Sequence, residues 1–125
     1  MHPTTMRIHT ITAVAVSAAA LTLLHPAAAR GAPAPELEYV YDVTVRRHYD
    51  FASPDAAVDY GHSICDRVGS GQGYPQVMGQ VKNEVLPNDE FAANYLVSNA
   101  VNLLCPDLLW QLRNSAAHYQ PPPGG

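Results

Sequence analysis

Apolar residues recur at intervals of three and four along much of this chain, which is the spacing of amphipathic helices. The first such run extends from Ser53 to Val68. Ser53 can cap it and Pro54 suits its first turn, while Gly69 or Gly71 is expected to end it. One stripe of this predicted helix contains the residues expected to face the core: Ala57, Val58, Gly61, Ile64, Cys65 and Val68.

The same spacing predicts two longer helices further along the chain. One follows the glycine-rich turn GSGQG and ends before Pro87. The other begins at Asn88-Asp89-Glu90, which supply a cap and first-turn acids. The apolar faces of these two helices contain Tyr74, Val77, Met78, Val81 and Val85 in the first, and Ala93, Val97, Ala100, Val101 and Leu104 in the second.

A last short helix is expected after Cys105, because Pro106 suits the first position of a helix. Its leucines, Leu108, Leu109 and Leu112, are expected to cover the core, with Trp110 at the edge.

Residues 36–50 fit two patterns. Alternate apolar residues and β-branched composition favour a strand, whereas other spacings fit a helix. A lone strand would have no partner in this chain. The residues that carry these two spacings are Leu37, Tyr39, Val40, Tyr41, Val43, Thr44 and Val45.

The N-terminus has the order of a secretory signal: Arg7, an apolar run, Pro26 and an Ala-x-Ala sequence. We expect residues 1–29 to be a signal peptide cleaved after Ala29. The apolar run is rich in Ala and Thr and barely long enough to span a bilayer, so cleavage is favoured over a retained anchor, and no membrane insertion is expected afterwards. Residues 30–36 are expected to be a Pro-rich linker, 37–117 a small helical disulfide domain, and 118–125 a disordered Pro/Gly tail.

Charge excludes one class of partner. The chain has 7 basic and 11 acidic residues, for a net charge of −4 with histidine neutral. Only Arg46 and Arg47 stand together, and two adjacent arginines do not make the basic face that phosphate binding requires. Nucleic acid is therefore not an expected partner.

The stretch AVDYGHSICDRV places His62 three residues before Cys65, one of two cysteines in the chain. A metal site, a nucleophile with its base, and a disulfide are the alternatives. No second Cys/His pair stands at ligand spacing, and the two side chains diverge around the helix. In a small exported domain, Cys65 and Cys105 are therefore expected to form a disulfide that joins two helices.

Two surface features remain as candidate sites. Asp55, Asp59, His62 and Asp66 share one face of the predicted helix at spacings of four, three and four. They could hold a cation, but a solvated charged face explains them more simply. Phe91 and Tyr95 lie off the core face of their helix, beside Ser98 and Asn102, and with Trp110 they form a candidate interaction surface. Packing against the segment before Ser53 is the alternative for the two aromatic residues of the helix.

The segments SPDAAVDYGHSICDRVGSG and FAANYLVSNAVNLLCP resemble a family of small exported actinobacterial proteins, the domain of unknown function 732. The first is similar to the family's Pro-capped helix with Gly before Cys, and the second to its closing helix that ends in Cys-Pro. The likeness covers about residues 50–106. It departs at His48, where the family usually has Gly. The resemblance implies an all-α domain with a Cys65–Cys105 bond, a helix before Ser53, and no established activity or cofactor.

Together these features predict an all-α fold, a small bundle of four to five short helices linked by one disulfide. No convergent set of catalytic residues is apparent, so we expect a non-enzymatic binding module of the cell envelope or extracellular space, without a cofactor, that binds another protein or an envelope component. A carrier of a small ligand or metal ion is the alternative.

Overall fold

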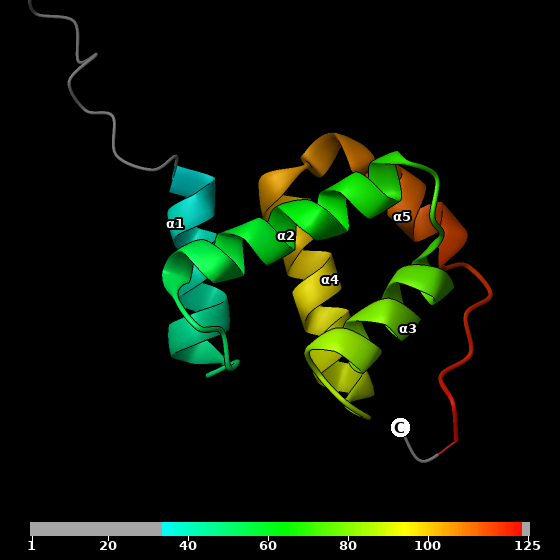
Figure 1. The fold of residues 1–125 in the computed structure, drawn as a ribbon. Helices are drawn as coiled ribbons and strands as arrows, with labels where there is room; N and C mark the ends of the chain where they lie inside the picture. Colours follow the sequence, from blue (N-terminus) through cyan, green and yellow to red (C-terminus); the bar gives the residue numbers. More distant parts are fainter. Residues whose placement is uncertain (1–33, 124–125) are drawn as a thin grey trace, which may run out of the picture. The chain divides into compact units, whose positions relative to one another are not determined.

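Five α-helices, one π-helical segment and one 3-10 segment make up the secondary structure of residues 34–123, the part of the chain that the computed structural model describes (Figure 1). Within these residues there is no strand, and one disulfide joins Cys65 to Cys105. The predicted all-α class with a single disulfide is confirmed. The elements are α1 (Ala34–Val40), η3 (Tyr41–Arg46), α2 (Pro54–Gly69), α3 (Tyr74–Glu84), α4 (Glu90–Leu104), η4 (Pro106–Leu108) and α5 (Leu109–Ser115).

Helix α2 begins where the sequence predicts. The Ser53 hydroxyl accepts a hydrogen bond of 3.0 Å from the Ala56 N–H, and Pro54 occupies the first turn. The helix ends at Gly69, and Gly71 follows with φ of +102°, a backbone angle that favours glycine. The predicted stripe is buried apart from Val58, which is half-buried; the buried members are Ala57, Gly61, Ile64, Cys65 and Val68.

Helix α4 is the central element, because it contacts α1, α2, α3 and α5 (Figure 1). Asp89 caps it through a 2.9 Å hydrogen bond from the Ala92 N–H. Its core side is wider than the predicted face, since Ala92 and Leu96 are also buried, while Leu104 is half-buried. A helix that must contact four others requires such a broad apolar face.

The segment before Ser53 is helical, which decides between the two patterns that the sequence allows. Neither predicted set of buried residues is correct, however. Tyr39 and Val43 are fully buried, whereas Leu37, Tyr41 and Val45 are at least half exposed. Tertiary packing overrides the local β-propensity, because the Tyr39 side chain fills a space against α2 that no strand could reach.

Gly61 of α2 makes this packing possible. A Cβ atom at this position would lie 2.6 Å from Leu104 Cδ1 and 2.7 Å from Tyr39 Cζ. Both α1 and α4 therefore approach α2 closely at one glycine. Gly61 is buried on the predicted core face, and it admits two neighbouring helices at once.

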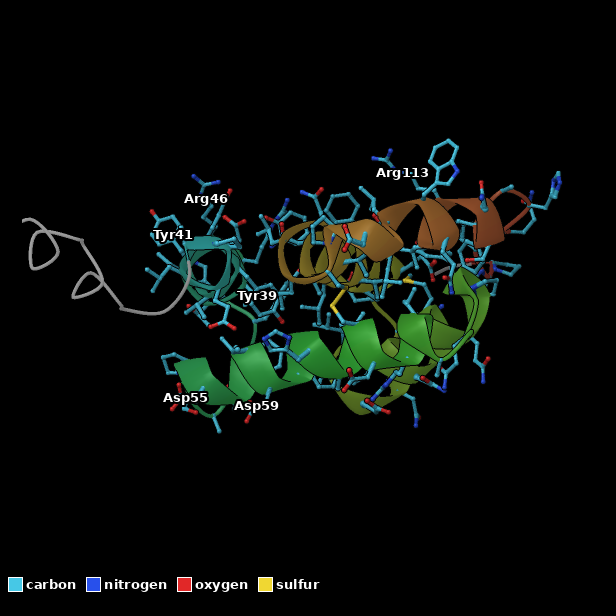
Figure 2. The ribbon with its side chains drawn as sticks, turned by 90° about the horizontal axis from the view of Figure 1, so that it is seen from above. Tyr39, Tyr41, Arg46, Asp55, Asp59 and Arg113 are labelled. Atoms are coloured by element: carbon cyan, nitrogen blue, oxygen red, sulfur yellow. A yellow bond between two sulfur atoms is a disulfide. The ribbon has the colours of Figure 1, made fainter. Side chains whose placement is uncertain are left out.

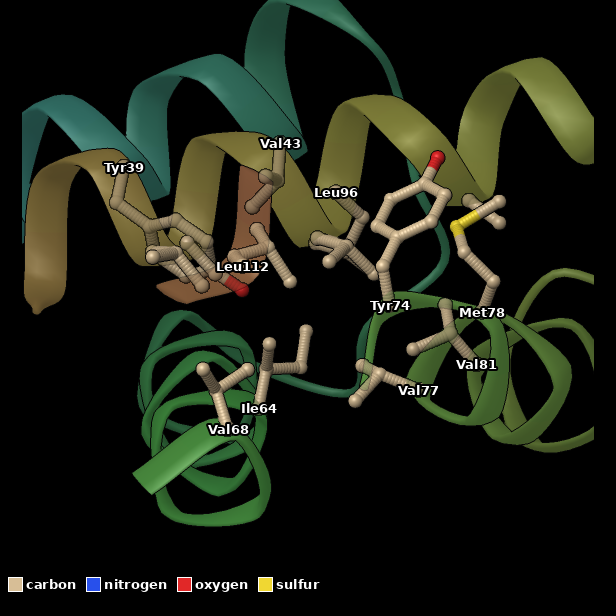
Figure 3. Packing of buried hydrophobic residues seen from close by; sticks show 14 of the residues in the cluster. Tyr39, Val43, Ile64, Val68, Tyr74, Val77, Met78, Val81, Leu96 and Leu112 are labelled. Carbon is tan, nitrogen blue, oxygen red and sulfur yellow. The ribbon is translucent and has the colours of Figure 1, made fainter. Parts of the chain in front are cut away.

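The core is continuous across all five α-helices (Figure 3). In Figure 3, Ile64 and Val68 of α2 point toward the same space as Leu112 of α5 and Tyr39 of α1, while Met78 and Val81 of α3 face Tyr74 and α4. Leu112 is buried as predicted, and Leu108 and Leu109 are packed against the core at its margin. Trp110 is 70% exposed, at the edge where the sequence predicts it.

The structure moves two predicted boundaries. Helix α1 starts at Ala34, so residues 34–36 are helical and not part of a linker, because Glu36 reaches His62 on α2. At the other end, Tyr119 was expected in a disordered tail, but its ring packs against Tyr74 with centroids 4.9 Å apart. An aromatic ring that finds a partly buried partner offsets the cost of ordering the chain that carries it.

The predicted signal peptide and its cleavage site lie outside the described residues, as does the end of the tail. In the part of the chain that is described, the helices are all too short or too polar to cross a bilayer.

Candidate functional site

An open groove of about 620 Å³ lies between α4 and α5. This volume falls within the range of sites that hold small molecules, roughly 300–1,000 Å³. Tyrosine, asparagine and serine side chains dominate its walls, and it contains a single charged residue. The groove is lined by Tyr74, Asn94, Tyr95, Ser98, Asn99, Asn102, Leu109, Leu112, Arg113, Ala116 and Tyr119.

One face of α4 forms the floor of the groove. Tyr95, Ser98 and Asn102 recur at helical spacing, and they lie opposite the buried residues Leu96, Val97 and Val101. Because the apolar side of α4 is committed to the core, the side that faces the groove is polar. The helix is amphipathic in the ordinary way, but its polar face is partly covered by α5.

Two amides of the floor are held in place from outside α4. The Asn94 Nδ2 group donates to the Tyr74 hydroxyl, and the Asn99 Nδ2 group donates to Asp42 Oδ2 at 3.3 Å. Asp42 is only 5% exposed and lies 3.4 Å from the Arg46 guanidinium. Each amide therefore presents its oxygen in a fixed direction.

Two other side chains of the floor are free to bind. Ser98 is half-buried and Asn102 is exposed. Among the described residues, neither side chain has a hydrogen-bond partner in the protein. A hydroxyl and an amide in this position can donate to and accept from a ligand.

Beside the groove, Arg47 stacks on the aromatic residues of α4. Its guanidinium lies 3.9 Å from the centre of the Tyr95 ring and 5.7 Å from that of Phe91. The Tyr49 ring meets the edge of Tyr95 with centroids 6.3 Å apart, and burial raises the pKa of Tyr49. Tyr95 thus packs against the segment before Ser53, as the alternative interpretation held, whereas Phe91 remains 70% exposed.

The predicted surface of Phe91, Tyr95 and Trp110 is therefore divided. The structure brings Phe91 and Tyr95 together around Arg47. Trp110 belongs to α5, next to Leu109 and one turn before Arg113, both of which line the groove. Figure 2 shows Arg113 on the α5 side, well apart from Tyr41 and Arg46 of η3. Tyr95 alone of the three predicted residues lines the groove, and Trp110 is an exposed residue of α5 outside the lining.

Hydrogen bonds join α3, α4 and the C-terminal segment next to the groove. The Tyr119 hydroxyl donates to Glu90 Oε1 and the Lys82 ammonium donates to Glu90 Oε2. Burial alone would raise the pKa of Glu90, but the two hydrogen bonds outweigh it and lower the pKa. Burial raises the pKa of both Tyr74 and Tyr119. The groove is thus bounded by tyrosines that stay protonated at neutral pH.

The acidic face of α2 does not gather into a cation site. The His62 Nε2 atom lies 2.9 Å from Glu36 Oε1 of α1, so the imidazole is directed to another helix. Figure 2 shows Asp55 and Asp59 on the outer side of α2. Over residues 34–123, His, Cys, Asp and Glu side chains nowhere meet in threes as a metal ion would require. The four residues Asp55, Asp59, His62 and Asp66 form a solvated face.

The disulfide joins α2 to the end of α4, the helix that forms the floor of the groove. Cys65 and Cys105 have Cα atoms 6.0 Å apart, which is ordinary for a disulfide. Cys65 lies on the buried stripe of α2, and Cys105 caps the C-terminal end of α4. The described residues include no free thiol, so neither cysteine is available as a metal ligand or nucleophile.

The pattern that defines the family described as protein of unknown function (DUF732) matches residues 35–107. The chain belongs to this family. The DUF732 match runs from α1 into η4, so all of α5 lies beyond it. The groove of this DUF732 protein therefore combines a floor from the family domain with a wall from outside it. No curated protein and no solved structure matches the chain.

Sequence reasoning found part of this site. It placed Tyr95, Ser98 and Asn102 on one face of α4, but it did not connect that face with α5 or identify the asparagines as a set. The signal was present as a polar stripe on α4 opposite its core face. The sequence does not show that α5 crosses this polar face of α4, because that arrangement depends on tertiary packing. The residues not identified in advance are Tyr74, Asn94, Asn99, Arg113, Ala116 and Tyr119.

Proposed function

We propose that this chain is an exported, non-enzymatic binding module of the cell envelope or extracellular space, and that its binding surface is the groove between α4 and α5. The groove itself carries the proposal, because its volume and its unpartnered polar side chains suit a ligand. Tyr95 provides aromatic surface within it, and the exposed Trp110 follows the lining residue Leu109 in α5.

Export is supported by two independent features. The N-terminal sequence has the order of a cleaved secretory signal. The Cys65–Cys105 disulfide is of the kind that persists outside the reducing cytosol. The resemblance to exported actinobacterial proteins agrees with both features.

A non-enzymatic role is supported by the chemistry of the groove. Its lining contains no His, Cys, Asp, Glu or Lys among the described residues. General acid–base or nucleophilic catalysis needs such groups, poised near neutral pH, in the cleft where substrate binds. Asp59 and Asp66, which flank His62 on α2, belong to a solvated helix face and not to a cleft.

The experiment compares the wild-type protein with Ser98→Trp, which would fill the groove without touching the core face of α4. Both proteins are produced in the organism from which the protein comes, the host, and are then immobilised. Each is exposed to a digest of the host's own cell envelope, and the retained material is identified by mass spectrometry. We expect the wild type to retain a component that Ser98→Trp loses. Equal retention by both proteins, with unchanged circular dichroism, would show that the groove is not the binding surface.

A small-ligand carrier is the second candidate, and the groove volume of about 620 Å³ favours it over a purely protein-binding surface. Native mass spectrometry distinguishes the two. A carrier isolated from its host retains a ligand of low mass, whereas a protein-binding module is recovered either bare or with a second polypeptide.

A further inference from the structure

We propose that the groove binds a short, uncharged saccharide, with the hydroxyl groups of the sugar on the floor formed by α4 and a pyranose face against Trp110. This inference rests on the proposed function, since it names the ligand class of the same groove. Its support comes from the charge, hydrogen-bonding and aromatic character of the lining.

The charge of the lining disfavours cations and polyanions. No carboxylate lines the groove, so a metal ion or cationic ligand has no counter-charge there. Arg113 is the one cation of the lining and Arg47 stacks on Tyr95 beside it, whereas a polyphosphate or nucleic acid requires several cations along its length. The other polar groups of the lining are uncharged, so the groove suits a ligand whose polar groups are mainly neutral.

The hydrogen-bonding groups match sugar hydroxyls. Amide and hydroxyl side chains both donate and accept, as each sugar hydroxyl does. The side chains of Ser98 and Asn102 have no hydrogen-bond partner among the described residues. Asn94 donates an N–H to the Tyr74 hydroxyl and Asn99 donates one to Asp42, so each keeps its amide oxygen free to accept. The floor thus alternates flexible and fixed hydrogen-bonding groups along α4.

The lining is poorly suited to a lipid chain. Leu112 is only 3% exposed and belongs to the core, which leaves Leu109 and Ala116, both half-buried, as the aliphatic residues that the groove exposes. An acyl chain on this floor would remove Ser98 and Asn102 from water without supplying hydrogen bonds, which is unfavourable. A polar ligand avoids that cost.

Trp110 supplies the aromatic platform. It is 70% exposed and directly follows Leu109, a lining residue of α5, whereas Arg47 already covers one face of Tyr95 at 3.9 Å. The face of an aromatic ring carries negative potential and attracts the polarised C–H groups on one side of a pyranose. In the proposed complex the sugar extends from the amide-rich floor past Leu109 to this exposed ring.

The test is a titration of the host-secreted protein, labelled with ¹⁵N, with chitotriose, maltotriose and mannotriose, and with hexaglycine and oleate as probes of other classes. We expect at least one trisaccharide to shift the amide signals of residues 94–102 and 109–116. Asn102→Ala should weaken that binding about tenfold, the effect of one or two lost hydrogen bonds, and Trp110→Ala should weaken it at least as much.

Matched controls are Asn114→Ala and Tyr41→Ala, an exposed amide and a half-exposed aromatic residue outside the groove, which should bind as the wild type does. The inference is overturned if no trisaccharide shifts the groove signals, if hexaglycine or oleate binds there instead, or if Asn114→Ala weakens binding as much as Asn102→Ala. If no trisaccharide binds but the groove still captures another envelope component, the saccharide inference fails and the proposed function stands. If neither a trisaccharide nor an envelope component binds in the groove, both are overturned.

Discussion

Gly61 is the residue on which the contact of three helices depends. The absence of a side chain lets the Tyr39 ring and Leu104 approach the α2 backbone. A close approach of this kind cannot be compensated by rotation of a flexible side chain, because the Tyr39 ring is fully buried.

We predict that Gly61→Ala destabilises the domain by about 1–3 kcal/mol, the usual cost of an overpacked core. Gly79→Ala is the matched control. No atom lies within 4 Å of a Cβ at that position of α3, so the better helix propensity of alanine should stabilise the domain by about 0.5–1 kcal/mol. Urea unfolding monitored by circular dichroism measures both changes. Equal effects of the two substitutions would contradict the packing described at Gly61.

His48 is a second residue set by backbone geometry. Its φ of 55° lies in the left-handed region, where glycine is favoured. The turn is fixed by a 2.9 Å hydrogen bond from the Tyr49 N–H to the Val43 carbonyl. The angle is therefore imposed by the exit from η3.

We predict that His48→Gly raises the free energy of unfolding by about 0.5–1 kcal/mol, because relief of the left-handed strain outweighs the added entropy of the unfolded chain. Asn88, with φ of 59°, is the control. Asparagine tolerates this region, so Asn88→Gly should gain less. Thermal unfolding of both variants under identical conditions measures these changes. A loss of stability in His48→Gly would show that the His48 side chain makes a contact that stabilises the fold by more than the backbone strain destabilises it.

At the scale of elements, Glu90 connects α3, α4 and the C-terminal segment through Lys82 and Tyr119. The folded-state pKa of Glu90 is lowered from its ordinary value of 4.5. A carboxyl group with a lowered pKa stabilises the fold above its unfolded pKa, and that contribution disappears as the pH falls through the folded pKa.

We predict that the stability difference between the wild type and Glu90→Gln is greatest near pH 7 and shrinks as the pH falls below about 4.5, as protonation removes the charge from Glu90. Denaturant unfolding at a series of pH values measures this difference. Glu38→Gln, at an exposed position of α1, is the control and should show a much smaller pH dependence. A constant difference across the series for Glu90→Gln would mean that its contacts do not depend on charge.

Elements with caps and clear periodicity were predictable from sequence. Ser53 with Pro54 and Asp89 with Glu90 mark the starts of α2 and α4 by local chemistry alone. The resemblance implied a helix in the segment of α1 and η3, but the buried face of this segment was not predictable, because Tyr39 and Val43 are four residues apart and fit the spacing of a strand as well as that of a helix. Its buried face is set by the space beside Gly61 and by the wider turn of the π-helix, which shifts side chains relative to a regular helix.

At the scale of the whole molecule, one covalent link and one core hold the helices in place. Cys65 and Cys105 enclose 40 steps of chain, including all of α3 and α4. The pairing was predictable from sequence because the chain has only two cysteines and one of them faces the core. The groove was not predictable, because it forms only when α5 crosses the polar face of α4.

We predict that the double substitution Cys65→Ala and Cys105→Ala lowers the free energy of unfolding by about 4 kcal/mol, the loop-closure contribution expected for a separation of 40 residues. Denaturant unfolding with and without reductant provides the measurement. Reductant should destabilise the wild type by a similar amount and leave the double variant unchanged. Insensitivity of the wild type to reductant would contradict a stabilising disulfide.

The central claim is that this is an exported protein, closed by one disulfide, that binds a ligand in the groove over α4. The most direct test is the intact mass of the protein released by its host, measured under native and then denaturing conditions, with and without reductant and thiol alkylation, for the wild type and Ser98→Trp. We predict a chain that begins at Arg30, resists alkylation until reduced, and carries a noncovalent ligand that Ser98→Trp lacks. A chain that keeps residues 1–29, has two free thiols, or carries the same noncovalent mass beyond the polypeptide in both proteins would contradict the account.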